Sequence, residues 1–161
     1  MIAKQLMFAI MTGMSDYNIH DVALFPSEVE CLAMNVYHES RGESLAGKSA
    51  VAHVTLNRVE SERYPSSICE VVYQAKTNDR GFPLRNQCQF SWYCDGRSDE
   101  ISLEELDSWK ISVEIALQAM MGLTIDPTSG ATHYFNPKKA SPSWVTSFER
   151  TAVLGEHEFY K

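Results

Sequence analysis

Apolar residues recur at helical spacing in the first well-patterned segment of the chain. Ser27 and Glu30 have the spacing of a capping box, and Gly42 stands where the pattern stops. Residues three and four apart lie on one face of a helix, so the apolar positions between these signals form one buried stripe. The stripe consists of Val29, Leu32, Ala33 and Val36. This pattern predicts a helix from Ser27 to just before Gly42.

Three later segments carry similar start signals. Ser44 is placed to cap a helix that runs to about Val59. A short helix is predicted from Ser67, with Glu70 three residues on, and a long one from Ser102, with Glu105 at the same spacing; Gly122 ends the long helix. In the helix after Ser44, one face carries Val51, Val54, Thr55 and Val59, and the opposite face carries His53, Asn57 and Glu60. His53 is therefore predicted to point to solvent.

The segment from Asn78 to Glu100 lacks the helical pattern of the segments around it. It is rich in glycine, polar and aromatic residues, which favours irregular structure or a short hairpin. The tail from Ala131 alternates enough to suggest short strands joined by turns at Asn136-Pro137 and Gly155. We therefore expect an α+β fold: a mainly helical single domain with a small β-hairpin or sheet.

Composition and charge limit the size of the domain and the kinds of partner that it can bind. The 161 residues, 44% of them hydrophobic, suit one compact domain, expected to be a monomer. A net charge of −7 disfavours nucleic acid and anionic membrane surfaces as partners. Residues 1–26 are expected to form an N-terminal extension, whose run of apolar residues is too short to span a bilayer. We expect a chain made in the cytoplasm, with a degenerate signal sequence as the alternative.

The cysteines and histidines do not have the sequence spacing of metal ligands. The four cysteines form no C-x-x-C pair, and the five histidines never pair at ligand spacing, so no metal site is predicted. His38 and Glu39 begin like an H-E-x-x-H motif, but Gly42 stands where its second histidine is needed. Cys88 and Cys94 are predicted to bridge across the aromatic loop between them. Cys31 and Cys69 are interpreted as small buried hydrophobes rather than as a second bridge.

Glu39 is the main candidate for catalysis. It lies three residues after Val36 and seven after Leu32, on the flank of the apolar stripe. Partial desolvation raises the pKa of a carboxyl group and lets it hold a proton near neutral pH, as a general acid must. The alternative is a surface glutamate in the last helical turn.

A family resemblance runs along the chain in five stretches. These are YHESRGESLAGKSAVAHVTLNRV, YPSSICEVVYQ, QFSW, GATHYFNP and LGEHEFYK, in that order. The chain resembles the cell wall hydrolase family of the spore-cortex-lytic enzyme SleB, over about residues 27–161. The resemblance implies a lysozyme-like catalytic domain that cleaves the glycan strand of peptidoglycan between N-acetylmuramic acid and N-acetylglucosamine. Glu39 matches the catalytic glutamate of the family. The layout is also similar to that of lytic transglycosylases, with Glu39-Ser40 in place of their Glu-Ser motif.

The chemistry of such an enzyme fits one principal carboxylate and no cofactor. Protonated Glu39 would donate to the glycosidic oxygen and then, as carboxylate, accept the proton of the muramic acid C6 hydroxyl, giving a 1,6-anhydro sugar. A hydrolytic muramidase would need a second carboxylate, for which Glu43, Asp79 and Asp95 are available by type. Glu43 lies within helical reach of Glu39 if the helix continues through Gly42; otherwise it bonds Arg41 or a backbone amide. Arg41 either orients a carboxylate or favours the helix C-terminus.

Substrate-binding residues are expected near Glu39 and in the aromatic loop. Sugar rings present apolar faces that lie on aromatic side chains, while amides and hydroxyls fix their orientation. Phe90 matches a family motif, and alternation puts it on one face with Trp92; the alternative for both rings is packing in the core. Tyr134 is expected to bond the sugar or Glu39, and His157 to make a structural hydrogen bond. The predicted substrate-binding set is Ser40, Glu43, Gln89, Phe90, Trp92, Tyr134 and Asn136.

Two rival classes stay open. An N-acetylmuramoyl-L-alanine amidase would cut the peptide from muramic acid, normally with a zinc-bound water. A non-catalytic glycan-binding module would keep the aromatic residues without needing Glu39 on the buried flank. In either case the expected place of action is the cell wall, reached by export or by holin-assisted release as a phage endolysin.

Overall fold

The computed structural model describes residues 25–161, with side chains from Glu28 onward. The predicted N-terminal extension, residues 1–26, falls almost wholly outside this range. The helices are α3 (Phe25–Glu39), α4 (Leu45–Val59), α5 (Ile68–Val72) and α6 (Leu106–Met120), and the strands are β1 (Ala75–Thr77), β2 (Pro83–Cys88), β3 (His133–Phe135), β4 (Arg150–Leu154) and β5 (His157–Tyr160). Short 3-10 helices lie at η1 (Ser91–Cys94), η2 (Leu103–Glu105) and η3 (Ser143–Ser147). No helix within these residues is long and apolar enough to cross a membrane.

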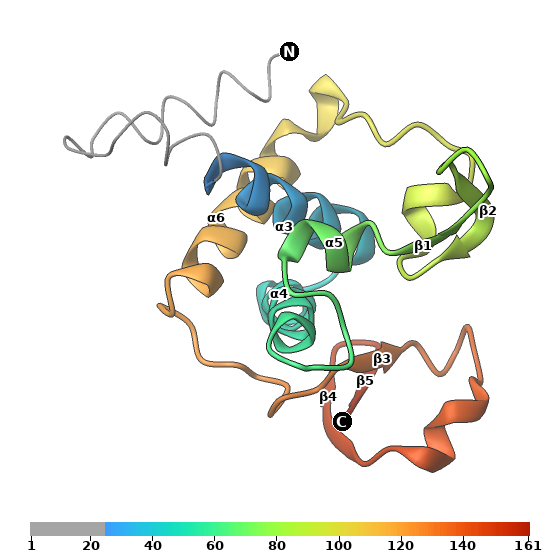
Figure 1. Ribbon diagram of the computed structural model, residues 1–161. Helices are drawn as coiled ribbons and strands as arrows, with labels where there is room; N and C mark the ends of the chain where they lie inside the picture. The colour runs from blue at the N-terminus through green and yellow to red at the C-terminus, as the bar shows by residue number, and fades with distance from the viewer. Residues whose placement is uncertain (1–24) are drawn as a thin grey trace.

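Helix α3 forms the centre of the helical part and packs against α4, α5 and α6 (Figure 1). The predicted apolar stripe is confirmed, because all four of its residues are fully buried: Val29, Leu32, Ala33 and Val36. The helix begins at Phe25, so Ser27 lies in its first turn and is not the N-cap. Glu28 instead contacts another helix, since its Oε2 accepts a hydrogen bond of 2.7 Å from the backbone N–H of Ile68 at the start of α5.

The other helix ends follow the sequence signals closely. Ser44 caps α4 by accepting from the backbone N–H of Gly47, and Ser67 caps α5 by accepting from that of Glu70. Gly42 and Gly122 adopt the left-handed conformation just after α3 and α6, with φ of 77° and 67°. Ser102 differs: the 3-10 turn η2 follows it, and α6 begins only at Leu106.

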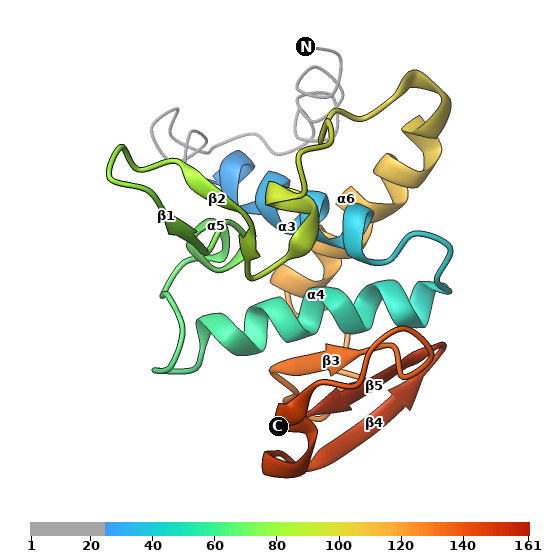
Figure 2. The ribbon, with the colours of Figure 1, turned by 90° about the vertical axis from the view of Figure 1, so that its right-hand side faces the viewer.

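Helix α4 is buried on two faces, not one. Val51 and Ala52 belong to the main helical core, while Ala50 and Val54 pack with Ala131 and Phe159 under the C-terminal sheet. Figure 2 shows α4 running between the β1–β2 hairpin above and the three-stranded sheet below.

The predicted solvent face of α4 is wrong for His53. This side chain is only 7% exposed, and its Nε2 lies 3.0 Å from Thr124 Oγ1. The amide of Asn57 likewise donates to Asp126 and to the carbonyl of Ala131. The segment that follows α6 covers this face, a long-range contact that helical periodicity cannot reveal.

Two small antiparallel sheets complete the fold. Strands β1 and β2 form the hairpin expected between the helices, with Ala75 opposite Cys88. The second sheet has the order β3-β5-β4, with Tyr134 opposite Phe159 and Leu154 opposite His157. The predicted α+β class, mainly helical with a small β-structure, is confirmed.

Two disulfides cross-link the chain, one between β2 and η1 and one between α3 and α5. The Cys88–Cys94 bridge is confirmed, with Cα atoms 6.1 Å apart. The interpretation of Cys31 and Cys69 as unbridged hydrophobes is wrong, because packing of α3 against α5 brings their Cα atoms to 5.2 Å and the sulfurs are bonded. This second bridge spans 38 residues and fixes α5 to the central helix.

The longer bridge is expected to matter more for stability. A disulfide restricts the unfolded chain more strongly when the loop that it closes is longer. We predict that replacing Cys31 and Cys69 by alanine lowers the free energy of unfolding by about 2 to 4 kcal/mol. Denaturant unfolding of the oxidised protein measures this, with the Cys88→Ala/Cys94→Ala double variant as the matched control. An equal or larger loss in the control would contradict the prediction.

Candidate active site

Glu39 is the last residue of α3, and buried polar contacts hold that helix in place one turn earlier. The Asn35 side chain donates to Thr55 Oγ1 of α4 at 3.0 Å and accepts from Trp92 Nε1 of η1 at 3.0 Å. Buried polar groups that satisfy one another fix a single packing arrangement. Asn35 thus ties α3, α4 and the aromatic loop together directly beneath Glu39.

Tyr134 brings the C-terminal sheet to Glu39. Its hydroxyl donates a hydrogen bond of 2.8 Å to Glu39 Oε2, across 95 residues of sequence. The ring packs against Phe159 and His157 of the neighbouring strand β5. Burial, followed by the charge of Glu39, raises the pKa of Tyr134 well above its ordinary value, so the phenol stays neutral and acts as a donor.

The surroundings of Glu39 favour its protonated form. Burial raises the pKa of the Glu39 carboxyl group, while the hydrogen bond from Tyr134 and the positive charge of Arg58 act in the opposite direction. The net shift is upward. A carboxyl group that keeps its proton nearer to neutral pH has the property required of a general acid.

Glu43 does not continue the helix. The left-handed turn at Gly42 ends α3, and Glu43 Oε1 instead lies 3.2 Å from His157 Nδ1, with both side chains mostly buried. A Cβ atom at Gly155 would clash with Glu43 Oε2, and one at Gly47 would lie 2.9 Å from the same oxygen. Both glycines therefore make room for this carboxylate, which joins the loop after α3 to the turn between β4 and β5.

Arg41 turns away from Glu39. Its guanidinium contacts the carboxylate of Glu105 on η2 and donates to the Tyr37 hydroxyl at 2.8 Å. Arg41 therefore pairs a carboxylate, but not the catalytic candidate.

The remaining polar candidates have structural partners. The Ser40 hydroxyl donates to the carbonyl of Val36 in the last turn of α3, and the Ser40 carbonyl accepts from Lys48 Nζ at 2.7 Å. The Asn136 side chain donates to Glu156 and accepts from the backbone N–H of Lys138, as a turn residue does. Gln89 is exposed on the loop.

Phe90 and Trp92 occupy the core. They are only 3% and 7% exposed and belong to the helical core cluster. Trp92 stacks on His38 with ring centroids 4.5 Å apart. The packing alternative therefore holds, and the expectation that these rings offer open faces to a sugar is wrong. The loop is long because it closes the core beside α3.

Sequence reasoning missed Arg58. This arginine is 4% exposed and lies within electrostatic range of both Glu39 and Tyr134. A signal was present, since Arg58 falls seven residues after Val51, on the face of α4 that also carries Val54 and Thr55. A charged residue on an apolar face is uncommon unless it has a specific role.

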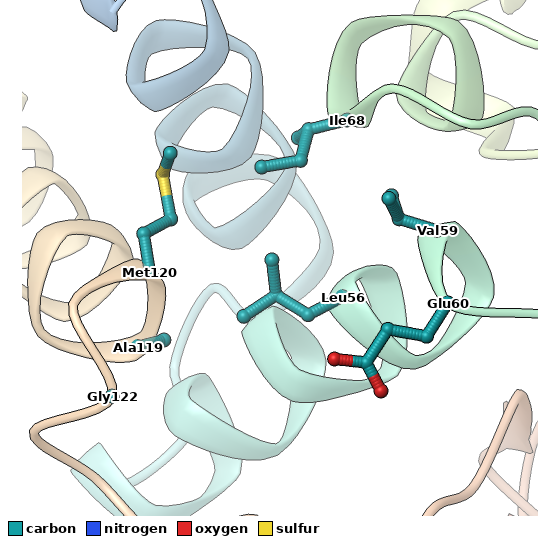
Figure 3. A pocket seen from close by; sticks show the side chains of 7 residues that line it. All are labelled: Leu56, Val59, Glu60, Ile68, Ala119, Met120 and Gly122. Atoms are coloured by element: carbon teal, nitrogen blue, oxygen red, sulfur yellow. The ribbon is translucent and has the colours of Figure 1, made fainter.

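One surface pocket lies apart from these residues. It is formed by α4, α5 and α6 and lined by Leu56, Val59, Glu60, Ile68, Ala119, Met120 and Gly122 (Figure 3). None of the predicted site residues lines it. Among residues 25–161, no cluster of three or more histidine, cysteine, aspartate or glutamate side chains could hold a metal ion.

Comparison with solved structures places this arrangement among known folds. The chain superposes on the catalytic domain of the Bacillus cereus SleB protein with a TM-score of 0.63 and 29% identity, covering 92% of this chain and 94% of that one. It superposes equally on the catalytic domain of the germination-specific lytic transglycosylase SleB from Bacillus anthracis, with a TM-score of 0.64, 28% identity, and 92% and 99% coverage.

Sequence comparison agrees with the structural match. The spore cortex-lytic enzyme of Bacillus cereus is 33% identical over 135 residues, which make up 84% of this chain and 44% of that enzyme. The enzyme of Halalkalibacterium halodurans is 32% identical over 133 residues, 83% of this chain and 34% of the relative. The chain thus spans less than half the length of these curated relatives. Residues 42–160 match the cell wall hydrolase family, and the chain therefore belongs to that family.

Proposed function

We propose that this chain degrades peptidoglycan by cleaving the bond between N-acetylmuramic acid and N-acetylglucosamine, as a lytic transglycosylase. The observation that carries the proposal is Glu39: a partly buried carboxyl group at a helix end, which accepts a hydrogen bond from Tyr134 and whose pKa is raised by desolvation. Membership in the cell wall hydrolase family supports the substrate class, and the likeness to a structure described as a lytic transglycosylase supports the reaction.

The proposed reaction uses Glu39 twice. The protonated carboxyl group donates its proton to the glycosidic oxygen as the bond from that oxygen to C1 of muramic acid breaks. The C6 hydroxyl of the same sugar then attacks C1, and its proton returns to the Glu39 carboxylate. The product carries a 1,6-anhydro ring, water is not consumed, and Glu39 ends in its starting state. Tyr134, held neutral, donates to the carboxylate form between the two steps.

A hydrolytic muramidase is the second candidate. Such an enzyme needs another carboxylate to act as nucleophile or to activate water. Glu43 is the acidic residue best connected to the site, but its carboxylate is paired with His157 and enclosed by Gly47 and Gly155. This pairing favours a positioning role for Glu43 and leaves Glu39 as the principal acid.

The glycan strand is the proposed partner, and the cell wall the proposed place of action. Peptidoglycan carries lactate and peptide carboxylates, and this chain has a net charge of −7. Long-range electrostatic attraction therefore cannot bring the two together, and short-range contacts must supply the binding.

The products distinguish the candidate reactions. We predict that digestion of purified peptidoglycan yields muropeptides that end in 1,6-anhydro-muramic acid, each lighter by one water than a muramidase product. Mass spectrometry and reducing-end analysis of the fragments decide this. Fragments with reducing muramic acid ends would identify a muramidase, and released stem peptides on intact glycan strands would identify an amidase.

The identity of the acid is tested by two isosteric variants. We predict that Glu39→Gln loses at least about 100- to 10,000-fold of the cleavage rate, the usual worth of proton donation, because glutamine has no proton to give at a workable pKa. Glu43→Gln should lose much less. Rates of fragment release from purified peptidoglycan measure both. Wild-type turnover in Glu39→Gln together with an inactive Glu43→Gln would show that the wrong glutamate has been chosen.

The same variant is expected to gain stability at neutral pH. Folding raises the pKa of Glu39 above its ordinary value of 4.5, so the stability that the protonated group contributes is complete below that value and is lost as pH rises through the folded-state pKa. Glutamine does not ionise. Denaturant unfolding should therefore show Glu39→Gln to be more stable than wild type near neutral pH, with the gap closing in acid. The exposed Glu104→Gln variant controls for the substitution itself, and a gap independent of pH would contradict the prediction.

A further inference from the structure

Arg58 is a buried cation that has no role in the reaction steps proposed above. Its Nε donates to the backbone carbonyl of Thr132 at 2.7 Å, which joins α4 to the residue just before β3. The guanidinium lies 5.3 Å from the ring centroid of Tyr64 and 5.0 Å from that of Phe90. The side chain is thereby held between two aromatic rings in one position.

The charge of Arg58 has no direct ion-pair partner among the described residues, and its buried Nη1 has no hydrogen-bond acceptor there. Leaving a buried donor unpaired is costly, and burying an unpaired charge is costlier still. Burial lowers the pKa of the Arg58 guanidinium, opposed by the charges of Tyr134, Tyr64 and Glu39. Glu39 is the carboxylate in this set, so it is the natural counter-charge.

Glu39 interacts with charged or titratable groups of two other elements. Tyr134 of β3 donates to it, and Arg58 of α4 acts on it through space. From β5, His157 faces the Tyr134 ring and pairs with Glu43. Arg58 is therefore the permanent positive charge that acts on this carboxyl group.

We propose that Arg58 is a positioning residue whose fixed positive charge stabilises the ionised carboxylate of Glu39 in the interval after it has given up its proton. This inference rests on the proposed function. Burial alone would favour the acid form needed for the first step and disfavour the carboxylate needed for the second. A guanidinium keeps its charge throughout the cycle, and in a poorly solvated site it acts without direct contact. Burial and Arg58 together keep both forms of Glu39 accessible.

The direct test is the titration of Glu39 itself. The full chain is labelled with isotopically enriched glutamate, and the side-chain carboxyl resonance of Glu39 is assigned by its absence in Glu39→Gln. Removing the charge in Arg58→Gln should raise the titration midpoint of Glu39 by roughly one pH unit, the scale of a nearby opposite charge. Arg58→Lys keeps the charge and should leave the midpoint close to that of wild type.

The cleavage rate gives a second readout. The acid must be protonated in the free enzyme, so a higher pKa of Glu39 moves the alkaline limb of the kcat/KM profile to higher pH in Arg58→Gln and not in Arg58→Lys. A purely structural role would lower the rate without moving that limb.

Several outcomes overturn the inference. A folded Arg58→Gln with an unchanged Glu39 midpoint does so, as does an equal shift in Arg58→Lys. If Arg58→Gln does not fold, Arg58→Met, which keeps the apolar stem between the two rings, is titrated in its place; if neither neutral variant folds at any pH, the role of Arg58 is structural and the inference fails. The titration needs no substrate, so a wild-type protein that does not cleave peptidoglycan would refute the proposed function and still leave this test decided.

Discussion

The hydrogen bond from Tyr134 to Glu39 is the point on which the arrangement of the molecule depends. It joins the end of the central helix to the first strand of the C-terminal sheet, two parts of the chain that are 95 residues apart. The bond can form only because α4 is buried on both faces, toward α3 on one side and toward the sheet on the other. The cost of burying a carboxyl group there is what raises the pKa of Glu39, so the packing of the core and the acidity of the site have one cause.

Much of the helical part could be predicted from local signals. Ser44 and Ser67 cap the helices that follow them, and the apolar stripe of α3 is buried as its spacing indicates, because capping and periodicity act within a few residues. The contacts of His53 could not be predicted in this way. They depend on where the segment after α6 returns, and a helix that is covered from a distant part of the chain looks the same in sequence as one that faces water.

The site could be predicted only in part, for the same reason. The position of Glu39 on the flank of the stripe is a local property, and the sequence indicates it. The pairing of Glu43 with His157 depends on a contact across 114 residues. The space for the Glu43 carboxylate depends on two glycines, Gly47 in α4 and Gly155 in the turn between β4 and β5. Phe90 and Trp92 were open to two interpretations because an aromatic residue in a loop is equally suited to a core and to a sugar. Only the fold distinguishes the two, and it places both rings inside.

The two disulfides tie the folding of this chain to its chemical environment. Thiols stay reduced in the cytoplasm of most organisms and pair in oxidising compartments. Under reducing conditions the chain therefore lacks the covalent link between α3 and α5 and the one that closes the aromatic loop. The first link holds α5 to α3, and the second closes the loop that carries Trp92. Reduction of the two bridges would accordingly leave a less stable form of the protein, more open to proteolysis.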